Sequence, residues 1–403
     1  LHRNADRIQI RSMANILFTA PPLVGHLNPA LAVAKHLQSQ GHVVAWAVHM
    51  DRVGNRMDPA MRCFDIGQFD PAGELDSTKV RGLESVRLFF EDYCVPMTRA
   101  CFKPILNIID DFKPDMLVVD HQMPAGALAA QAAGLPWVSL VTTTASILKL
   151  SDTLDEWVSA QFASLQDELL PAELHRARPD LSPHAVLVFS NQKLMGNLNQ
   201  CLPAPYTFVG PTQGEGRAAV AFPWDKLKTG TRKVLLTLGT VSRDRDTRFF
   251  EVFLQAFAQM PDVQAIVVAP ESLAELAPAN VIVSSFVPQM ELLPHMDVVV
   301  CHAGHNTVCE ALRFGIPLGV APIRDDQPVI ARQVIDAGAG ISIRFGKVTP
   351  AAALHTLNEL LDNPVYRQAA QELATHFAQA TGAQGAAQHI ERLINDTEMS
   401  TPR

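Results

Sequence analysis

The segment "VVVCHAGHNTVCEAL", residues 298–312, contains the change of pattern that decides the fold. A run of valines typical of a buried strand gives way to a short turn of small and polar residues, and a helix-spaced run follows at once. The first N–H groups of a helix lack partners within it, and the helix dipole favours negative charge at that end. The segment therefore predicts a strand, a turn and a helix whose N-terminus binds an anion such as phosphate.

The same segment has two other interpretations, a metal site and a capped helix. The potential metal ligands are Cys301, His302, His305 and Cys309. They converge poorly on one point, because one follows the strand directly while another lies inside the predicted helix. Thr307 and Glu310 have the spacing of a capping box, in which both would only terminate a helix. The order of strand, turn and helix favours the anion site, and the cap remains the alternative.

Apolar runs and helix-spaced segments alternate on both sides of this unit. In the first half, strands are predicted at 15–20, 42–48, 116–120, 184–190 and 206–210. In the second half they are predicted at 233–239, 263–269, 281–286, 297–301, 317–322 and 339–345, with helices at 246–260, 305–314 and 327–337. Such alternation is typical of βαβ units around parallel sheets that are buried on both faces.

The alternation lapses at residues 211–230, which contain Gly, Pro and Lys without periodicity, and this lapse predicts a domain boundary. The predicted fold is α/β, with two doubly wound Rossmann-like domains that face a cleft. Its parts are a first domain at 13–215, a linker at 216–230, a second domain at 231–380, and a closing helix and tail at 381–403 that brace the first domain. Ligands in such sheets bind beyond the carboxyl ends of the strands, so the cleft is the predicted active site.

Composition excludes several classes of protein. The chain has 33 Lys and Arg against 41 Asp and Glu, a net charge of -8, and no run of like charges, which disfavours a nucleic-acid partner. Its six cysteines form no CxxC pair, which indicates reduced thiols in a cytoplasmic protein. Residues 1–12 precede Met13 and lack the apolar core of a signal peptide, so they are interpreted as an extension.

One uncharged span, residues 122–148, exceeds the ~20 residues that a membrane helix needs. Gly126, Gly134 and Pro136 interrupt it, and the pattern there favours a helix end, a turn and a buried strand. We therefore predict no membrane span.

The wider segment at 285–334 resembles the nucleotide-sugar signature of the UDP-glycosyltransferase family, in particular its bacterial natural-product, macrolide-type members with the GT-B fold. The matching positions are Phe286, Pro288, Gln289, His302, Gly304, Asn306, Thr307, Glu310, Gly315, Pro317, Asp326 and Gln327. The resemblance implies the following contacts: the uracil with Phe286, the ribose with Gln289 and Glu310, the diphosphate with His302, Asn306 and Thr307, and the sugar with Asp326 and Gln327.

Two further stretches extend this resemblance. "LLTLGTVSRD" at 235–244 is similar to the family's Gly-Ser/Thr loop, which implies that Gly239 and Thr240 also touch the diphosphate. Val287 and Gly304 are included in the same donor-binding set. The chain departs from many plant members at two places, where Phe286 and His305 stand in place of Trp, and a phenyl ring still offers a π-face for stacking.

The family's catalytic motif is matched by "PPLVGHLNPAL" at 21–31, which places His26 after the first strand and just before a helix. The resemblance implies that His26 is the general base and that Asp120, at the end of the strand "MLVVD", orients it. His121 is adjacent to Asp120, but neighbouring side chains diverge in direction, so we interpret it as structural. The aromatic cluster at 89–102 has helical spacing, and such a stripe is more often core than acceptor pocket.

A second possible metal site is the Asp-x-Asp pair in "SRDRDT", residues 242–247. In a different glycosyltransferase fold this pattern binds a divalent cation at the sugar diphosphate. We disfavour it here, because the helix N-terminus and His302 are expected to supply the positive potential that a metal would. Asp325 and Asp326 have an alternative role as caps of the helix that begins near Gln327.

These features predict an inverting, metal-independent glycosyltransferase without a cofactor. It would move a hexose, glucose in the first instance, from a UDP-sugar to a hydroxyl of a small, largely apolar acceptor, as a cytoplasmic monomer or homodimer. A dTDP-deoxysugar is the alternative donor. The rival functions are a nucleotide-sugar epimerase or isomerase on a similar scaffold, and a non-catalytic glycosyltransferase-like partner protein.

Overall fold

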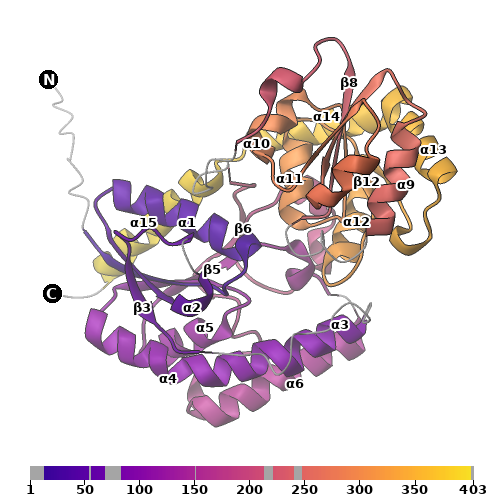
Figure 1. Ribbon diagram of the computed structural model, residues 1–403. Coiled ribbons are helices and arrows are strands. Elements are labelled where there is room, and N and C mark those ends of the chain that lie inside the picture. The colour runs from indigo at the N-terminus through magenta and orange to yellow at the C-terminus, as the bar shows by residue number, and fades with distance from the viewer. Residues whose placement is uncertain are drawn as a thin grey trace, which may run out of the picture.

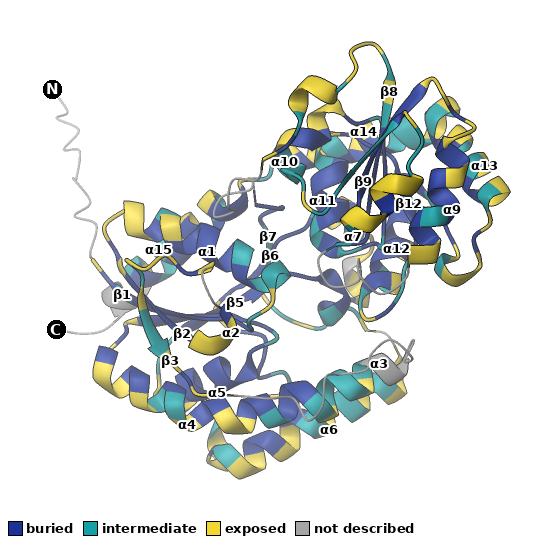
Figure 2. Cartoon of the chain, in the orientation of Figure 1, coloured by how far each residue is buried: buried dark blue, intermediate teal, exposed yellow. Residues whose placement is uncertain are grey.

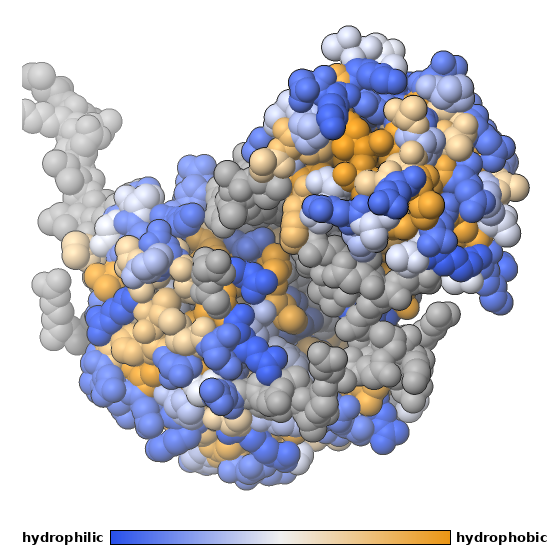
Figure 3. Space-filling model, in the orientation of Figure 1, coloured by the Kyte–Doolittle hydropathy of each residue, from blue (hydrophilic) through white to orange (hydrophobic). Residues whose placement is uncertain are grey.

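The computed structural model describes residues 13–53, 56–68, 83–149, 151–212, 221–239 and 247–400. It consists of two α/β domains, each built on a parallel sheet with helices on both faces (Figure 1). Buried residues fill the central strands and the inward faces of the helices (Figure 2). The surface is hollowed where the two domains meet (Figure 3).

The first domain's sheet has seven strands within the described residues, in the order β3-β2-β1-β4-β5-β6-β7. They are β1 (Asn15–Thr19), β2 (Val43–Val48), β3 (Arg62–Asp65), β4 (Met116–Asp120), β5 (Trp137–Val141), β6 (Val186–Val188) and β7 (Tyr206–Phe208). All pairs are parallel, and the strand order reverses between β1 and β4.

The second domain's sheet has six strands in the described part of the chain, in the order β10-β9-β8-β11-β12-β13. They are β8 (Arg232–Thr237), β9 (Val263–Val268), β10 (Val281–Ser284), β11 (Val298–Cys301), β12 (Leu318–Val320) and β13 (Gly340–Ser342). The order reverses between β8 and β11. Each domain therefore has one topological switch point, the place where doubly wound sheets bind ligands.

The helices connect successive strands. Those described are α1 (Val24–Ser39), α2 (Met50–Val53), α3 (Leu83–Leu88), a π-helical turn (Phe89–Cys94), α4 (Val95–Phe112), α5 (Pro124–Ala132), α6 (Asp152–Leu169), α7 (Gln192–Met195), α9 (Thr247–Phe257), α10 (Gln289–Leu292), α11 (His305–Arg313), α12 (Gln327–Asp336), α13 (Pro350–Asp362), α14 (Pro364–Phe377) and α15 (Gly382–Ser400). Among the described residues, no helix is long and apolar enough to cross a membrane.

The last helix, α15, returns to the first domain and lies beside α1 (Figure 1). Its Ala386 and Ile390 share a buried cluster with Leu27 of α1. The returning chain also packs against the outgoing one: the Gly382 N–H donates to the Val209 carbonyl at 2.7 Å. A Cβ at Gly210 would lie 2.3 Å from Ala380 Cβ, so only glycine fits where the segment that leaves the first domain meets the segment that returns to it.

The structure changes two details of the predicted elements that bear on the site. Helix α1 begins at Val24, so His26 lies in its first turn and not in a loop before it. The capping-box interpretation of Thr307 and Glu310 is wrong, because α11 begins at His305 with Gly304 at the N-cap position and both residues lie inside the helix.

Candidate active site

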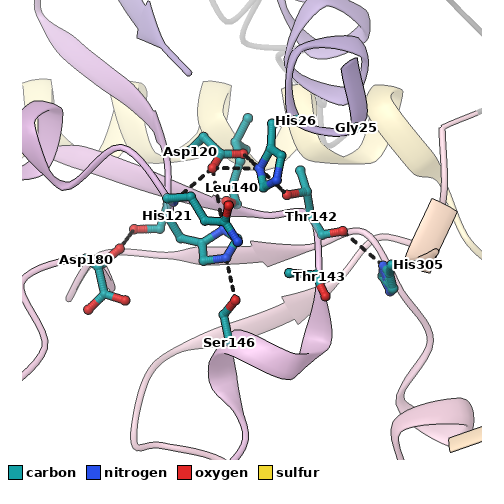
Figure 4. Close-up of polar contacts among 12 residues, drawn as sticks. Gly25, His26, Asp120, His121, Leu140, Thr142, Thr143, Ser146, Asp180 and His305 are labelled. Carbon is teal, nitrogen blue, oxygen red and sulfur yellow. Dashed lines mark hydrogen bonds and ion pairs between the residues drawn. The ribbon is translucent and has the colours of Figure 1, made fainter. Parts of the chain in front are cut away.

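His26 and Asp120 meet at the switch point of the first domain (Figure 4). His26 comes from the first turn of α1, directly after β1, and Asp120 ends the neighbouring β4. The His26 Nδ1 atom lies 3.0 Å from both carboxylate oxygens of Asp120. Asp120 is fully buried and also accepts a hydrogen bond from the Gln122 N–H at 2.9 Å. The carboxylate is thus held in one orientation.

This pairing sets the protonation chemistry of His26. Burial alone would lower the pKa of the imidazole, but the charge and hydrogen bond of Asp120, helped by the charge of Asp326, outweigh it and raise the pKa. Burial likewise would raise the pKa of Asp120, and His26 outweighs it and lowers that pKa. With the proton on Nδ1 facing Asp120, Nε2 carries the lone pair and makes no hydrogen bond to any described residue. Nε2 is therefore available as a base.

Thr142, which sequence reasoning missed, completes this group. Its hydroxyl lies 2.7 Å from His26 Nδ1 and 3.4 Å from Asp120, to which it donates. It follows β5, the strand beside β4. No motif spacing marks it, because the contact depends on which strands are neighbours in the sheet.

His121 is structural in its contacts. Its Nδ1–H donates to the Leu140 carbonyl at 3.0 Å, and Nε2 lies 2.8 Å from the Ser146 hydroxyl. Burial lowers its pKa, so the ring is neutral. His26, Asp120 and His121 have ligand atoms within 4.8 Å of one another, but these atoms are already bonded to protein groups.

The four ligands of the proposed Cys and His metal site do not gather into such a group among the described residues. Burial raises the pKa of the Cys301 and Cys309 thiols to about 12, so both are protonated. His305 donates from Nδ1 to the Thr142 carbonyl of the first domain at 3.0 Å. Its contact is thus a link between domains.

His302 occupies the switch point of the second domain, packed between two glycines. It follows β11, and Gly239 follows β8, the adjacent strand. A Cβ would lie 2.7 Å from the His302 ring if placed on Gly239, and 2.5 Å if placed on Gly304. Side chains at either position would displace the imidazole. The glycines of both motifs are therefore explained by the space that His302 takes.

His302 was expected to add to the positive potential at this turn, and a neutral ring can do so only through an N–H group. Burial, followed by the nearby charge of Arg324, lowers its pKa to about 4, so the ring is neutral near pH 7. Its Nδ1 atom is buried and has no hydrogen-bond partner among the described residues. Such an atom is unusual in a folded protein and marks a place where a ligand can bind. His302 can offer a hydrogen bond to a phosphate oxygen but no positive charge.

The turn after His302 presents backbone N–H groups at the same place. Ala303 has a φ of 64°, a left-handed conformation that is uncommon for a residue with a side chain. The first bond within α11 runs from the Val308 N–H to the Gly304 carbonyl. The preceding N–H groups of His305, Asn306 and Thr307 thus lack partners inside the helix, as an anion site requires.

Asn306 joins this turn to α1, the helix of the other domain that carries His26. Its side-chain amide donates to the Gly25 carbonyl at 3.1 Å. In an ordinary helix that carbonyl would accept from the N–H four residues on, but that residue is Pro29, which has none. The Gly-His-x-x-Pro spacing therefore leaves a helix carbonyl free, next to the base, for the second domain to use.

Gln289, Glu310 and Phe286 are the residues predicted to contact the ribose and the uracil. The Gln289 amide donates to a Glu310 carboxylate oxygen at 2.7 Å, so each orients the other. Phe286, two residues after the end of β10, is 50% exposed, whereas Val287 packs against the core. The predicted contact Thr240 lies outside the described residues, as do both aspartates of "SRDRDT".

Asp326 and Gln327 differ in what they contact. Asp326 accepts a hydrogen bond from the Thr143 hydroxyl of the first domain at 2.6 Å. It stands at the N-cap position of α12, but its side chain makes no capping bond to a described residue, so the capping alternative is wrong for Asp326. The Gln327 side-chain oxygen accepts from the Ile323 and Arg324 N–H groups, at 2.8 and 3.1 Å. Gln327 thus shapes the loop beside the site.

Known proteins similar to this chain were found by sequence and by structure. Residues 254–393 match the erythromycin biosynthesis protein CIII-like C-terminal domain. The 4'-demethylrebeccamycin synthase of Lentzea aerocolonigenes is 26% identical over 94% of this chain and 100% of its own. The uncharacterized UDP-glucosyltransferase YojK of Bacillus subtilis (strain 168) is 27% identical over 96% and 99%. Over nearly its whole length, this chain is therefore similar to bacterial glycosyltransferases of the natural-product type.

The fold comparison agrees with this assignment. The spinosyn rhamnosyltransferase SpnG, solved with thymidine diphosphate, superimposes with a TM-score of 0.74 at 18% identity. The match covers 94% of this chain and 100% of that one. The two parallel-sheet domains are those of the GT-B fold.

Proposed function

We propose that this protein is a glycosyltransferase that transfers glucose from UDP-glucose to a hydroxyl of a small, largely apolar acceptor, with inversion and without a metal or cofactor. The observation that carries the proposal is the His26–Asp120 pair, with Nδ1 bonded on both carboxylate oxygens and Nε2 left available. The pair lies at the switch point of the first domain. Asn306, at the switch point of the second domain, donates a hydrogen bond to α1, the helix that carries His26.

The chemistry follows from these positions. The acceptor hydroxyl gives its proton to His26 Nε2 as its oxygen attacks the anomeric carbon and the bond to the diphosphate breaks. Asp120 stabilises the imidazolium that forms, because its carboxylate is buried and already oriented. Attack in line with the leaving group inverts the anomeric carbon. A positioned base of this kind contributes roughly 10²- to 10⁴-fold to the rate.

The leaving diphosphate is held by dipoles in this proposal. The N–H groups at the start of α11 and the neutral His302 ring converge after β11. Preorganised donors aimed at developing charge typically contribute several kcal/mol to a transition state. We expect activity to survive EDTA. A loss of activity on chelation, with recovery on adding manganese, would overturn the proposal that the diphosphate is held without a metal.

Two observations support UDP-glucose as the donor. The first is that YojK carries the name of a UDP-glucosyltransferase. SpnG, in contrast, was solved with thymidine diphosphate, so dTDP-glucose is the alternative donor to test. Asp326, a partly buried hydrogen-bond acceptor, suits a sugar with free hydroxyls. We propose that the enzyme acts in the cytoplasm, as a monomer or homodimer, where its six free cysteines stay reduced.

The test is a donor and acceptor screen. Purified enzyme is incubated with UDP-glucose or dTDP-glucose and a panel of hydroxylated aromatics and polyketides, and the product's anomeric configuration is determined by NMR. We expect a β-glucoside from the α-configured donor. An α-linked product would overturn inversion. Conversion of a UDP-sugar incubated alone into another UDP-sugar would identify an epimerase instead.

A further inference from the structure

Three consecutive threonines follow β5, and each contacts a different group. The Thr142 hydroxyl contacts the His26–Asp120 pair in its own domain. The Thr143 hydroxyl donates to Asp326 at 2.6 Å, and the Thr144 hydroxyl donates to the Gln333 side-chain oxygen at 3.0 Å, both in the second domain. The first two threonines are drawn with the base in Figure 4.

The Thr143–Asp326 bond occupies the carboxylate that the donor sugar is proposed to use. Thr143 is 4% exposed, so its hydroxyl is held in place by its surroundings. Asp326 is partly buried. A carboxylate in such a place is costly to leave without a donor. The Thr143 hydroxyl is such a donor.

We propose that Thr143 is a specificity-determining residue whose hydroxyl substitutes for a sugar hydroxyl at Asp326. This inference rests on the proposed function, because it assumes that Asp326 contacts the donor sugar. A donor with the matching hydroxyl exchanges the Thr143–Asp326 bond for its own. A donor that lacks this hydroxyl leaves the Thr143–Asp326 bond intact.

The consequence is a relaxed choice of donor. A site that hydrogen-bonds a substrate hydroxyl normally rejects the deoxy analogue, because its own buried group is left unpaired. Here Asp326 stays paired with either donor, so the two bind with similar affinity. Removing the Thr143 hydroxyl restores the ordinary penalty against the deoxysugar. The variant should therefore be more selective than the wild type.

The experiment measures donor binding, so it needs no acceptor. Dissociation constants are determined by calorimetry for UDP-glucose and for analogues that lack the 3-, 4- or 6-hydroxyl. If dTDP binds more tightly than UDP, the dTDP series is used. The variants are Thr143→Val, Thr143→Ser, which keeps the hydroxyl, and Thr144→Val, a matched change in the same segment whose partner is Gln333.

We expect Thr143→Val to raise the preference for glucose over one of the three analogues by roughly 3- to 30-fold, the range of a hydrogen bond to a charged group partly replaced by water. Thr143→Ser and Thr144→Val should keep the wild-type ratio. Equal ratios in Thr143→Val and Thr144→Val would overturn the proposal. So would a loss of preference in Thr143→Val, which would mean that the hydroxyl itself binds glucose.

A second comparison separates this inference from the proposed function. Asp326→Ala should weaken UDP-glucose binding more than UDP binding. If it weakens both equally, Asp326 does not contact the sugar and the proposed role of Asp326 fails together with the inference. If UDP-glucose alone is affected while Thr143→Val matches Thr144→Val, only the inference about Thr143 is wrong.

Discussion

The two domains share one topology but hold their histidines in opposite electrostatic states. Each domain places one residue after its first strand and one at the carboxyl end of the strand beside it: His26 and Asp120 in the first, Gly239 and His302 in the second. The pKa of His26 is raised because Asp120 outweighs burial, whereas that of His302 falls to about 4 because burial and the nearby charge of Arg324 both lower it. The charged partner of each histidine, not its position in the fold, thus decides whether its pKa is raised or lowered.

The largest effect should come from removing the paired histidine. His26→Ala is expected to lower kcat by roughly 10²- to 10⁴-fold, because the acceptor hydroxyl loses its base. UDP binding, measured by calorimetry, should be unchanged, since the diphosphate turn belongs to the other domain. A variant with wild-type turnover would show that His26 is not the base.

Asp120→Asn removes the charge that distinguishes His26 from His302. The loss of a buried charge partner is expected to lower kcat by roughly 10²- to 10³-fold. Because Asp120 raises the pKa of His26, the substitution lowers that pKa. His26 must be neutral to act, so the acid limb of the kcat/KM profile should move to lower pH. A limb that stays in place would remove Asp120 from the mechanism.

His302 offers the converse test. His302→Ala should weaken UDP binding by roughly tenfold, the order of one hydrogen bond to a charged group, while His302→Gln keeps a neutral donor and should lose less. With a pKa of about 4, wild-type His302 does not titrate above about pH 5. UDP affinity should therefore have the same pH dependence in the wild type and in His302→Gln from about pH 6 to 8. An affinity that rises toward pH 6 in the wild type alone would mean that His302 binds as a cation.

Much of the fold was predictable, because buried parallel strands are apolar runs separated by helices and turns. Strand β3 was missed, since "RCFD" has no continuous apolar run and its residues are only partly buried or exposed. The sequence also placed His26 after the first strand, Asp120 at a strand's end and His302 directly after a strand, and the structure confirms these three positions.

The contacts between domains could not be predicted. Thr143 and Asp326 are 183 residues apart, and their hydrogen bond depends on how two separate sheets are placed. The neutral state of His302 also required its burial, because its motif alone does not distinguish a charged ring from a neutral one. Sequence patterns thus identify which residues take part in the site, whereas packing decides what each of them does.

The smallest effect concerns the Gly25 carbonyl, which accepts the Asn306 hydrogen bond between the two domains. In Pro29→Ala the new N–H at position 29 can donate to the Gly25 carbonyl, drawing it along the helix axis and away from the Asn306 amide. We expect kcat/KM for the donor to fall by roughly two- to tenfold, the range of one net hydrogen bond. Thermal stability should stay level or rise, because a proline inside a helix is unfavourable.

Pro104→Ala is the matched control for this change, since Pro104 also lies inside a long helix, α4, which packs against α5 and α6. It should alter stability in the same direction and leave kcat/KM at the wild-type value. A fall in kcat/KM of equal size in both variants would show that the effect comes from replacing any proline inside a helix, not from the Gly25 carbonyl. A fall confined to Pro29→Ala, and absent when the same substitution is made in an Asn306→Ala background, would show that the free carbonyl of Gly25 acts through Asn306. The Gly-His-x-x-Pro motif would then have two functions, presenting the base to the acceptor and keeping one carbonyl available to hold the donor domain against it.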